Sequence, residues 1–362
     1  MNITLERTCT LPVDAAFPYN FARHARWCPD GSPAALVQTE NRTFHVVHLD
    51  SVTKTFPQAS PILSLAWYPT ASPSSPATFC FVAAIRDCPI HLFDASDGRL
   101  RASYPIIDHR EQHVAPHCMA FNLMGTKLYC GHPDAIEVFE VSQPGHEGLR
   151  IPTSPTKKSK DGLKGIISAI SFTWGYYAIG TLTPCDFPIA IYSEEDDELV
   201  GFVGGGPRAA VIQLAFTPAG QLLASFRRHS AIYAWDLSAP DAPVAVYDFG
   251  TPTTSNQRRY FDLHPTGRWL AVGDEAGTVH VFDLTSENRT SFSVHGDAVP
   301  SVAFHPTEPL LLTVAGSRHF DDVDDEDEEK KLHPVVRDAS IKVWRFVLDF
   351  HAFTCIACAV KY

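Results

Sequence analysis

The sequence predicts an all-β fold built from a repeated unit of short strands. Apolar runs of four to seven residues alternate with turns such as Thr-Pro-Ala-Gly and His-Pro-Thr-Gly. The last apolar run of each unit closes on an acidic, aromatic or basic residue, and these closing positions are spaced by 44, 46, 52, 44, 47 and 62 residues. Because four-stranded units of about 40–45 residues form the blades of WD-repeat proteins, we predict a seven-bladed WD-repeat β-propeller.

The seven units follow one another between residues 20 and 346. The sixth, Thr254–Leu284, shows the pattern most clearly, because two turns separate its three apolar runs. The fourth is degenerate, and the fifth ends in a Trp-Asp pair at Trp235. The strands expected in the other units include Ala34–Thr39, Thr43–Leu49, Phe79–Ile85, Ile90–Asp94, Lys127–Cys130, Ile136–Glu140, Tyr176–Thr181, Val211–Phe216, Ala231–Asp236, Ser301–Phe304, Leu310–Ala315 and Ser340–Arg345.

A ring of blades must also close. The seventh blade needs an outer strand, which either the N-terminal segment 1–19 or the run Phe346–Phe353 could supply. We favour the apolar stretch Ile3–Leu11 of the N-terminal segment, which leaves residues 347–362 as a C-terminal tail.

Two loops depart from the repeat. Pro152–Lys164 is basic and rich in Ser, Thr and Pro, which fits a solvated connection better than a contact controlled by phosphorylation. The segment 321–331 carries eight acidic and two basic residues. We interpret this acidic insertion as solvated disorder, with a docking tail as the alternative.

Composition limits the classes of function. The formal net charge of −12 argues against a generally basic nucleic-acid binder, although the acidic insertion alone supplies half of this charge. No apolar run reaches the ~20 residues of a membrane span, and no secretory signal is recognisable. The nine cysteines show no disulfide-like spacing, so we expect reduced cysteines in the nucleus, with some protein in the cytoplasm.

Arginine and amide side chains gather in two sets of loops that lie on the same face of a propeller. The loops joining second and third strands contain Arg86, Arg227, Arg228 and Arg318. The loops leading into the blades contain Lys164, Arg208, Asn256, Gln257, Arg258 and Arg259. Arginine forks bind phosphate, and amides read the edges of splayed bases. The alternative is that these are ordinary loop arginines paired with Asp274, Glu275 and Asp297.

Signals for catalysis and metal binding are weak. The string His-Arg-Glu-Gln-His at His109–His113 misplaces the glutamate of a zinc-protease motif, and Cys355–Cys358 is a single CxxC pair. Gly204–Gly206 lacks the lysine and helix of a phosphate loop. We expect His117 and His295 to be structural. The sequence therefore predicts a protein that is not an enzyme, with no metal site and no cofactor.

Four strings resemble stretches of the telomerase Cajal body protein family, and the resemblance extends from Asn20 to Arg345. They are NFARHARWCPDG (Asn20–Gly31), RDCPIHLFDASDGRLRASY (Arg86–Tyr104), TSNQRRYFDLHPTG (Thr254–Gly267) and AGTVHVFD (Ala276–Asp283). The resemblance implies a propeller that recognises the short CAB-box loop of box H/ACA guide RNAs, including telomerase RNA. It also implies partnership with ribonucleoprotein core proteins, localisation to Cajal bodies or nucleoplasm, and no membrane association.

The hypothesis for which residues contact RNA rests on their position in the loops, and most of them also lie in matching strings. Arg86, Asn256, Gln257 and Arg258 lie in these strings, and Arg318 ends the run His305–Arg318, which also fits the family. Arg227 and Arg228 align with a basic pair that varies in the family, and Tyr260 and Asp262 fit blade architecture better than RNA contact. Spliceosomal RNA is a further possible target. The rival hypothesis is a WD-repeat protein scaffold, for example in pre-mRNA splicing, that does not recognise RNA directly.

Overall fold

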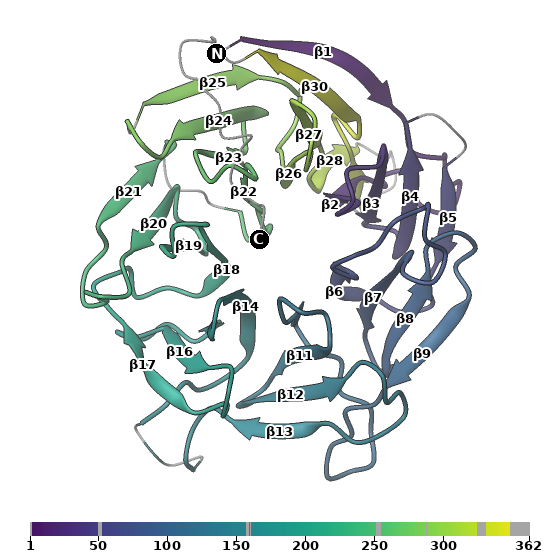
Figure 1. Cartoon of the computed structure of the whole chain (residues 1–362). Helices are drawn as coiled ribbons and strands as arrows, with labels where there is room; N and C mark the ends of the chain where they lie inside the picture. Colours follow the sequence, from purple (N-terminus) through teal and green to yellow (C-terminus); the bar gives the residue numbers. More distant parts are fainter. Residues whose placement is uncertain are drawn as a thin grey trace.

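The computed structural model describes residues 2–49, 53–156, 159, 161–250, 255–286, 288–323 and 331–347. All regular elements within these residues are β-strands, which form seven four-stranded antiparallel sheets and one two-stranded sheet. Figure 1 shows the seven sheets standing around a central axis, with the chain passing from one to the next. The predicted seven-bladed propeller is therefore confirmed.

The strands of each blade are given from the inside of the ring outwards. Blades one to three contain β2 (Ala22–Trp27), β3 (Ala34–Thr39), β4 (Thr43–His48), β5 (Lys54–Pro57), β6 (Ile62–Trp67), β7 (Cys80–Ile85), β8 (Ile90–Asp94), β9 (Leu100–Tyr104), β10 (Cys118–Phe121), β11 (Lys127–His132), β12 (Ala135–Glu140) and β13 (Leu149–Pro152).

Blades four to seven contain β14 (Ile167–Thr173), β15 (Tyr176–Thr181), β16 (Ile189–Ser193), β17 (Leu199–Val203), β18 (Val211–Phe216), β19 (Leu222–Phe226), β20 (Ala231–Trp235), β21 (Ala245–Asp248), β22 (Asp262–Leu263), β23 (Trp269–Gly273), β24 (Thr278–Asp283), β25 (Arg289–Ser293), β26 (Ser301–Phe304), β27 (Leu310–Val314), β30 (Ile341–Val347) and β1 (Asn2–Cys9).

The core lies between neighbouring blades. The second strands are largely buried, and β3, β7 and β27 are buried along their whole length, because both faces of each sheet are covered by the adjacent blades. Outer strands such as β25 alternate between exposed and half-buried residues. Between blades one and two, Phe44 and Phe81 meet with ring centroids 5.2 Å apart in an edge-to-face arrangement. Continuous apolar runs in the sequence thus become the middle of each blade.

The N-terminal strand closes the ring. β1 pairs antiparallel with β30, from Asn2 opposite Val347 to Cys9 opposite Ile341, and lies outside it in Figure 1. Ile3 packs against the apolar cluster between blades six and seven. The first and last strands of the described residues therefore share one sheet, and the outer strand comes from the N-terminal segment, as we favoured. Residues 348–353 of the alternative run lie outside the described residues.

The acidic insertion differs from the expectation. Its flanks belong to β28 (His319–Val323) and β29 (Lys331–Val335), which pair as an antiparallel hairpin with Val323 opposite Lys331. The expectation of disorder was wrong for 321–323 and residue 331, because strand pairing satisfies their backbone groups despite the acidic composition. Residues 324–330 lie outside the described part of the chain, as does the CxxC pair Cys355–Cys358.

Blade six has an unusually short inner strand. β22 contains only two residues, and the segment before it bonds to the neighbouring blades instead. The Phe261 amide donates to Gln213 Oε1 of blade five at 2.9 Å, and the Tyr260 amide donates to the Pro300 carbonyl, next to blade seven, at 2.8 Å. The segment 256–260 is thereby held across the face where the loops gather.

Candidate nucleic-acid interface

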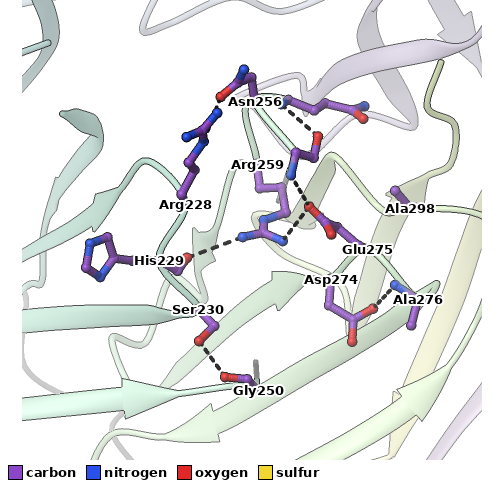
Figure 2. A network of polar contacts seen from close by, with 12 residues as sticks. Arg228, His229, Ser230, Gly250, Asn256, Arg259, Asp274, Glu275, Ala276 and Ala298 are labelled. Carbon is purple, nitrogen blue, oxygen red and sulfur yellow. Dashed lines mark hydrogen bonds and ion pairs between the residues drawn. The ribbon is translucent and has the colours of Figure 1, made fainter. Parts of the chain in front are cut away.

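The loops leading into the blades and the loops joining second and third strands lie on one face, which we call the loop face. Two contacts join them. Arg228 Nε donates to Asn256 Oδ1 at 3.0 Å, as Figure 2 shows, and Gln257 Nε2 donates to the Gly316 carbonyl at 2.8 Å. The structure thus brings Arg228, Asn256 and Gln257 together.

A cavity of about 520 Å³, which we call the rim cavity, opens on the loop face between blades six, seven and one. Three of the predicted site residues, Asn256, Gln257 and Arg318, line it. The other charged or imidazole side chains lining the cavity are those of Arg23, Glu40, Arg259, Glu275, Asp297 and His319.

The backbone at Gly316 fixes one wall of the rim cavity. Gly316 has a φ of +137°, and a Cβ at this position would lie 2.3 Å from Phe21 Cβ. Only glycine allows this close approach without displacement. The approach also holds the Gly316 carbonyl where Gln257 donates to it.

Carboxylates balance the arginines of the rim cavity. Arg318 donates to Glu40, which Arg23 also approaches at 3.3 Å, and Arg259 lies 3.9 Å from Glu275. Of the three acidic partners expected from the sequence, only Glu275 pairs with an arginine in the described residues. Asp274 bonds to His280 and Asp297 bonds to His319. Glu40 was not anticipated.

Arg259 has a largely structural environment. Its side chain is 13% exposed, and its guanidinium donates to the His229 carbonyl at 3.3 Å, as Figure 2 shows. The guanidinium also lies over the ring of Phe249. Burial lowers the pKa of Arg259 from its usual value. Arg259 therefore supports the floor of the loop face, while Arg318, with a side chain 64% exposed, remains accessible.

Arg227 and Arg228 are exposed at the turn between β19 and β20. Arg228 has a φ of +62°, a left-handed conformation that non-glycine residues seldom adopt. Neither arginine forms an ion pair with another described residue. They stand beside Gln257 and Arg259 around a smaller hollow next to the rim cavity.

A second cavity of about 340 Å³ shares Arg23, Glu40 and Arg318 with the rim cavity. We call it the aromatic cavity, because Phe17, Tyr19 and Phe320 line it. The sequence reasoning missed these residues, because its site prediction considered only arginine, lysine and amide side chains of the loops. The cluster Phe-Pro-Tyr at positions 17–19 was the available signal. Aromatic rings beside arginines offer stacking surfaces for unpaired bases.

Arg258 and Arg86 do not join the rim cavity. From Gln257 to Tyr260 the side chains alternate between two sides: Gln257 and Arg259 line the rim cavity, while Arg258 and Tyr260 line a channel on the propeller axis. Arg86 is exposed at the turn between β7 and β8, and its charge helps to lower the pKa of His117 in that channel.

The two histidines that we expected to be structural have different surroundings. His295 bonds to Thr313 at 2.7 Å and to Asp338 at 3.2 Å within blade seven, which confirms its structural role, whereas the side chain of His117 lines the channel.

No cluster of three or more metal-ligating side chains occurs among the described residues, including His109 and His113. Within the same residues, no helix is long and apolar enough to cross a membrane.

Comparisons with known proteins extend over most of the chain. The mouse (Mus musculus) protein named telomerase Cajal body protein 1 is 30% identical over 339 residues, covering 86% of this chain and 62% of the relative. The Drosophila melanogaster homologue is 28% identical over 328 residues, covering 84% and 58%. A Schizosaccharomyces pombe protein named guanine nucleotide-binding protein negative regulator 1 is 25% identical over 352 residues, covering 86% and 84%. No family model matches the chain. The chain thus spans about three fifths of the mouse and fly relatives.

Proposed function

Because the chain belongs to the telomerase Cajal body protein family, with 30% identity to the mouse member over 86% of its length, we propose that it is a non-enzymatic RNA-binding propeller. Its RNA is of the small nuclear or Cajal-body class, with a CAB-box-type loop as in box H/ACA guide RNAs. The relatives are named for telomerase and for the Cajal body, and we extend both associations to this chain as part of the proposal.

The observation that supports this proposal is the meeting of Asn256, Gln257, Arg228 and Arg318 on the loop face. Amide groups both donate and accept hydrogen bonds, so they can read the edges of an unpaired base. Arg228 and Arg318 are exposed and can bind phosphates with two parallel hydrogen bonds. The aromatic cavity next to them offers a stacking surface for a neighbouring base.

The carboxylates of the rim cavity do not prevent phosphate binding. The ion pair between Arg318 and Glu40 joins an exposed guanidinium to a nearly buried carboxylate. Arg318 donates to Glu40 through Nε and Nη2, so its Nη1 donors remain for a phosphate, and Arg23 stays 3.3 Å from Glu40 as a second partner. Glu40 then orients Arg318 before RNA arrives.

The proposed role in the cell is that of a subunit in ribonucleoprotein assembly or localisation. It would act in the nucleus, in Cajal bodies or nucleoplasm, together with ribonucleoprotein core proteins. Spliceosomal or telomerase particles are the candidate assemblies. No step of this role requires a cofactor.

The experiment is a salt titration of RNA affinity. We expect the double variant Arg228→Gln, Arg318→Gln to bind a single-stranded CAB-box RNA more weakly than the wild type. The slope of log affinity against log salt should fall by about 1.4, since each lost phosphate contact on a single strand contributes about 0.7. The matched control, Arg150→Gln with Arg289→Gln, removes two exposed arginines from the outer strands β13 and β25. Equal slopes for the two double variants would refute the RNA interface.

A protein scaffold without RNA recognition is the second candidate. The charge balance of the rim cavity favours it, since three arginines there face three carboxylates. The fission yeast relative also carries a name that refers to a guanine nucleotide-binding protein rather than to RNA. A scaffold would keep its protein partners in the double variant and show no salt-dependent RNA binding.

A further inference from the structure

A channel of about 370 Å³ runs along the propeller axis, apart from the rim cavity. Residues of the inner strands β2, β6, β10, β14 and β18 line it, together with Arg258 and Tyr260. Its charged side chains are Arg26 and Arg258, and no Asp or Glu belongs to its lining in the described residues. The channel therefore carries positive charge without a carboxylate on its wall.

Arg26 has an acidic partner, Asp262, which does not itself line the channel. Its guanidinium donates to one carboxylate oxygen of Asp262, and the other oxygen of Asp262 accepts the Phe304 amide at 2.8 Å. Both oxygens of Asp262 are thus occupied by partners away from Arg258. Asp262 neutralises Arg26 and no further cation.

Arg258 lacks such a partner. It forms no ion pair with a described carboxylate, and the groups close to it are Tyr260 and Cys118. The phenol of Tyr260 raises the pKa of Arg258, yet a phenol is uncharged at neutral pH. Burial raises the pKa of the Cys118 thiol to about 12, so this group is uncharged as well. A half-buried guanidinium without an anion is costly unless a ligand supplies the charge.

Two imidazoles complete the surroundings of Arg258. His24 is 9% exposed and stacks on Tyr260, with ring centroids 4.0 Å apart and planes inclined by 19°. His117 lines the same channel. Burial and the charge of Arg258 lower the pKa of both rings, which are therefore neutral at pH 7 and can donate a hydrogen bond without a charge of their own.

We propose that the axial channel binds a phosphate group, for which Arg258 supplies the positive charge and Tyr260, His24 and His117 supply neighbouring polar groups. The site does not depend on the proposed RNA function, because Arg258 faces the channel while Gln257 faces the rim cavity. The phosphate can come from a free phosphate or phosphomonoester, or from an RNA strand that reaches the channel mouth.

The test is calorimetric titration of the full chain with inorganic phosphate at constant ionic strength. The wild type should bind phosphate, sulfate should compete, and chloride should not. Arg258→Gln should weaken binding at least ~10-fold, because it removes the one unpaired cation that the described residues place in the channel, while the outer-strand control Arg150→Gln should bind like the wild type. Phosphate stabilises many proteins by exclusion from their surface, so thermal stability alone is not the readout.

Two results would overturn the site: no phosphate binding by the wild type, or equal binding by Arg258→Gln. If Arg258→Gln does not fold, Arg258→Lys and the competition by sulfate decide instead, since a lysine retains the charge but not the fork.

A second arm identifies the source of the phosphate. If the RNA supplies the phosphate group in the channel, excess inorganic phosphate should weaken RNA binding by the wild type more than RNA binding by Arg258→Gln. If the natural ligand is a free phosphate, excess phosphate should weaken RNA binding by both proteins equally. Phosphate binding without any RNA binding would remove the proposed function and leave this site intact.

Discussion

Glu40 controls the charge of the loop face. Its side chain is 8% exposed and pairs with two arginines. Arg23 is near in the sequence, whereas Arg318 comes from the opposite end of it. The sequence placed Arg318 on the correct face but could not reveal this partner, because the two residues lie 278 positions apart and meet only when the ring closes. Charge counts from sequence therefore overstated the positive character of the rim cavity.

Replacing Glu40 by glutamine should strengthen RNA binding. The change keeps the shape of the side chain and frees the charges of Arg23 and Arg318 for phosphates. We expect affinity to rise several-fold at low salt and the salt slope to become steeper by about 0.7 to 1.4. Anisotropy titrations at several salt concentrations measure both. The control Glu195→Gln removes an exposed acid from the turn between β16 and β17; an equal gain there would point to net charge alone.

The alternation of side chains from Gln257 to Tyr260 separates residues that the sequence grouped together. Asn256, Gln257 and Arg318 line the rim cavity as expected for one site, while Arg258 turns into the channel. Loop membership could be read from the turn pattern, but side-chain direction could not, because it depends on backbone bonds to Gln213 and Pro300 in the neighbouring blades.

Gly316 should tolerate no side chain. Alanine there would place a Cβ 2.3 Å from Phe21 Cβ at a φ of +137°. We expect Gly316→Ala to lower the free energy of unfolding by about 2 kcal/mol and to weaken RNA binding, because the carbonyl that holds Gln257 would move. Urea unfolding and RNA titration measure the two effects. Gly201→Ala, which has open space around the new Cβ, should change neither.

Among the single strands, the sequence predicted the bounds of buried strands well and the length of the short inner strand β22 poorly. Ala34–Thr39, Tyr176–Thr181 and Val211–Phe216 match β3, β15 and β18, because continuous apolar runs bounded by turns specify buried strands. β22 is shorter than its apolar run suggested, since hydrogen bonds to adjacent blades replace part of the strand. Such competition depends on tertiary contacts.

The closing strand β1 offers a direct test of how the ring is held together. Ile3 packs between blades six and seven, whereas Leu5 on the same strand is 50% exposed. Ile3→Lys should lower the unfolding free energy by about 1–3 kcal/mol, because it places a charge against the apolar cluster. Leu5→Lys should have an effect below about 0.5 kcal/mol. Similar losses in both variants, measured by urea unfolding, would show that Ile3 does not anchor the strand.

At the scale of the whole molecule, buried histidines couple stability to pH. His45 is 2% exposed and His295 is 7% exposed, and burial lowers the pKa of each to about 4. Their folded pKa lies below the unfolded value of about 6.5, so the unfolded chain binds protons more readily. Stability is therefore retained above pH 6.5 and lost as the pH falls from 6.5 towards 4.

We expect the unfolding free energy to fall by several kcal/mol between pH 7 and pH 4, with up to about 3 kcal/mol from each of these histidines. Urea unfolding at intervals of one pH unit measures the change. His45→Gln should flatten the dependence, while the exposed His146→Gln should preserve it. A stability that stays constant from pH 7 to pH 4 would be incompatible with neutral buried rings.

We propose the whole propeller as a receptor for small nuclear RNA. The most direct measurement is ultraviolet crosslinking of the protein in its own cells, followed by sequencing of the recovered RNA. We expect enrichment of box H/ACA or telomerase RNA, with crosslinks in a short unpaired loop and loss of signal in the Arg228→Gln, Arg318→Gln variant. RNA recovery at background level would contradict it and leave a propeller that binds only proteins.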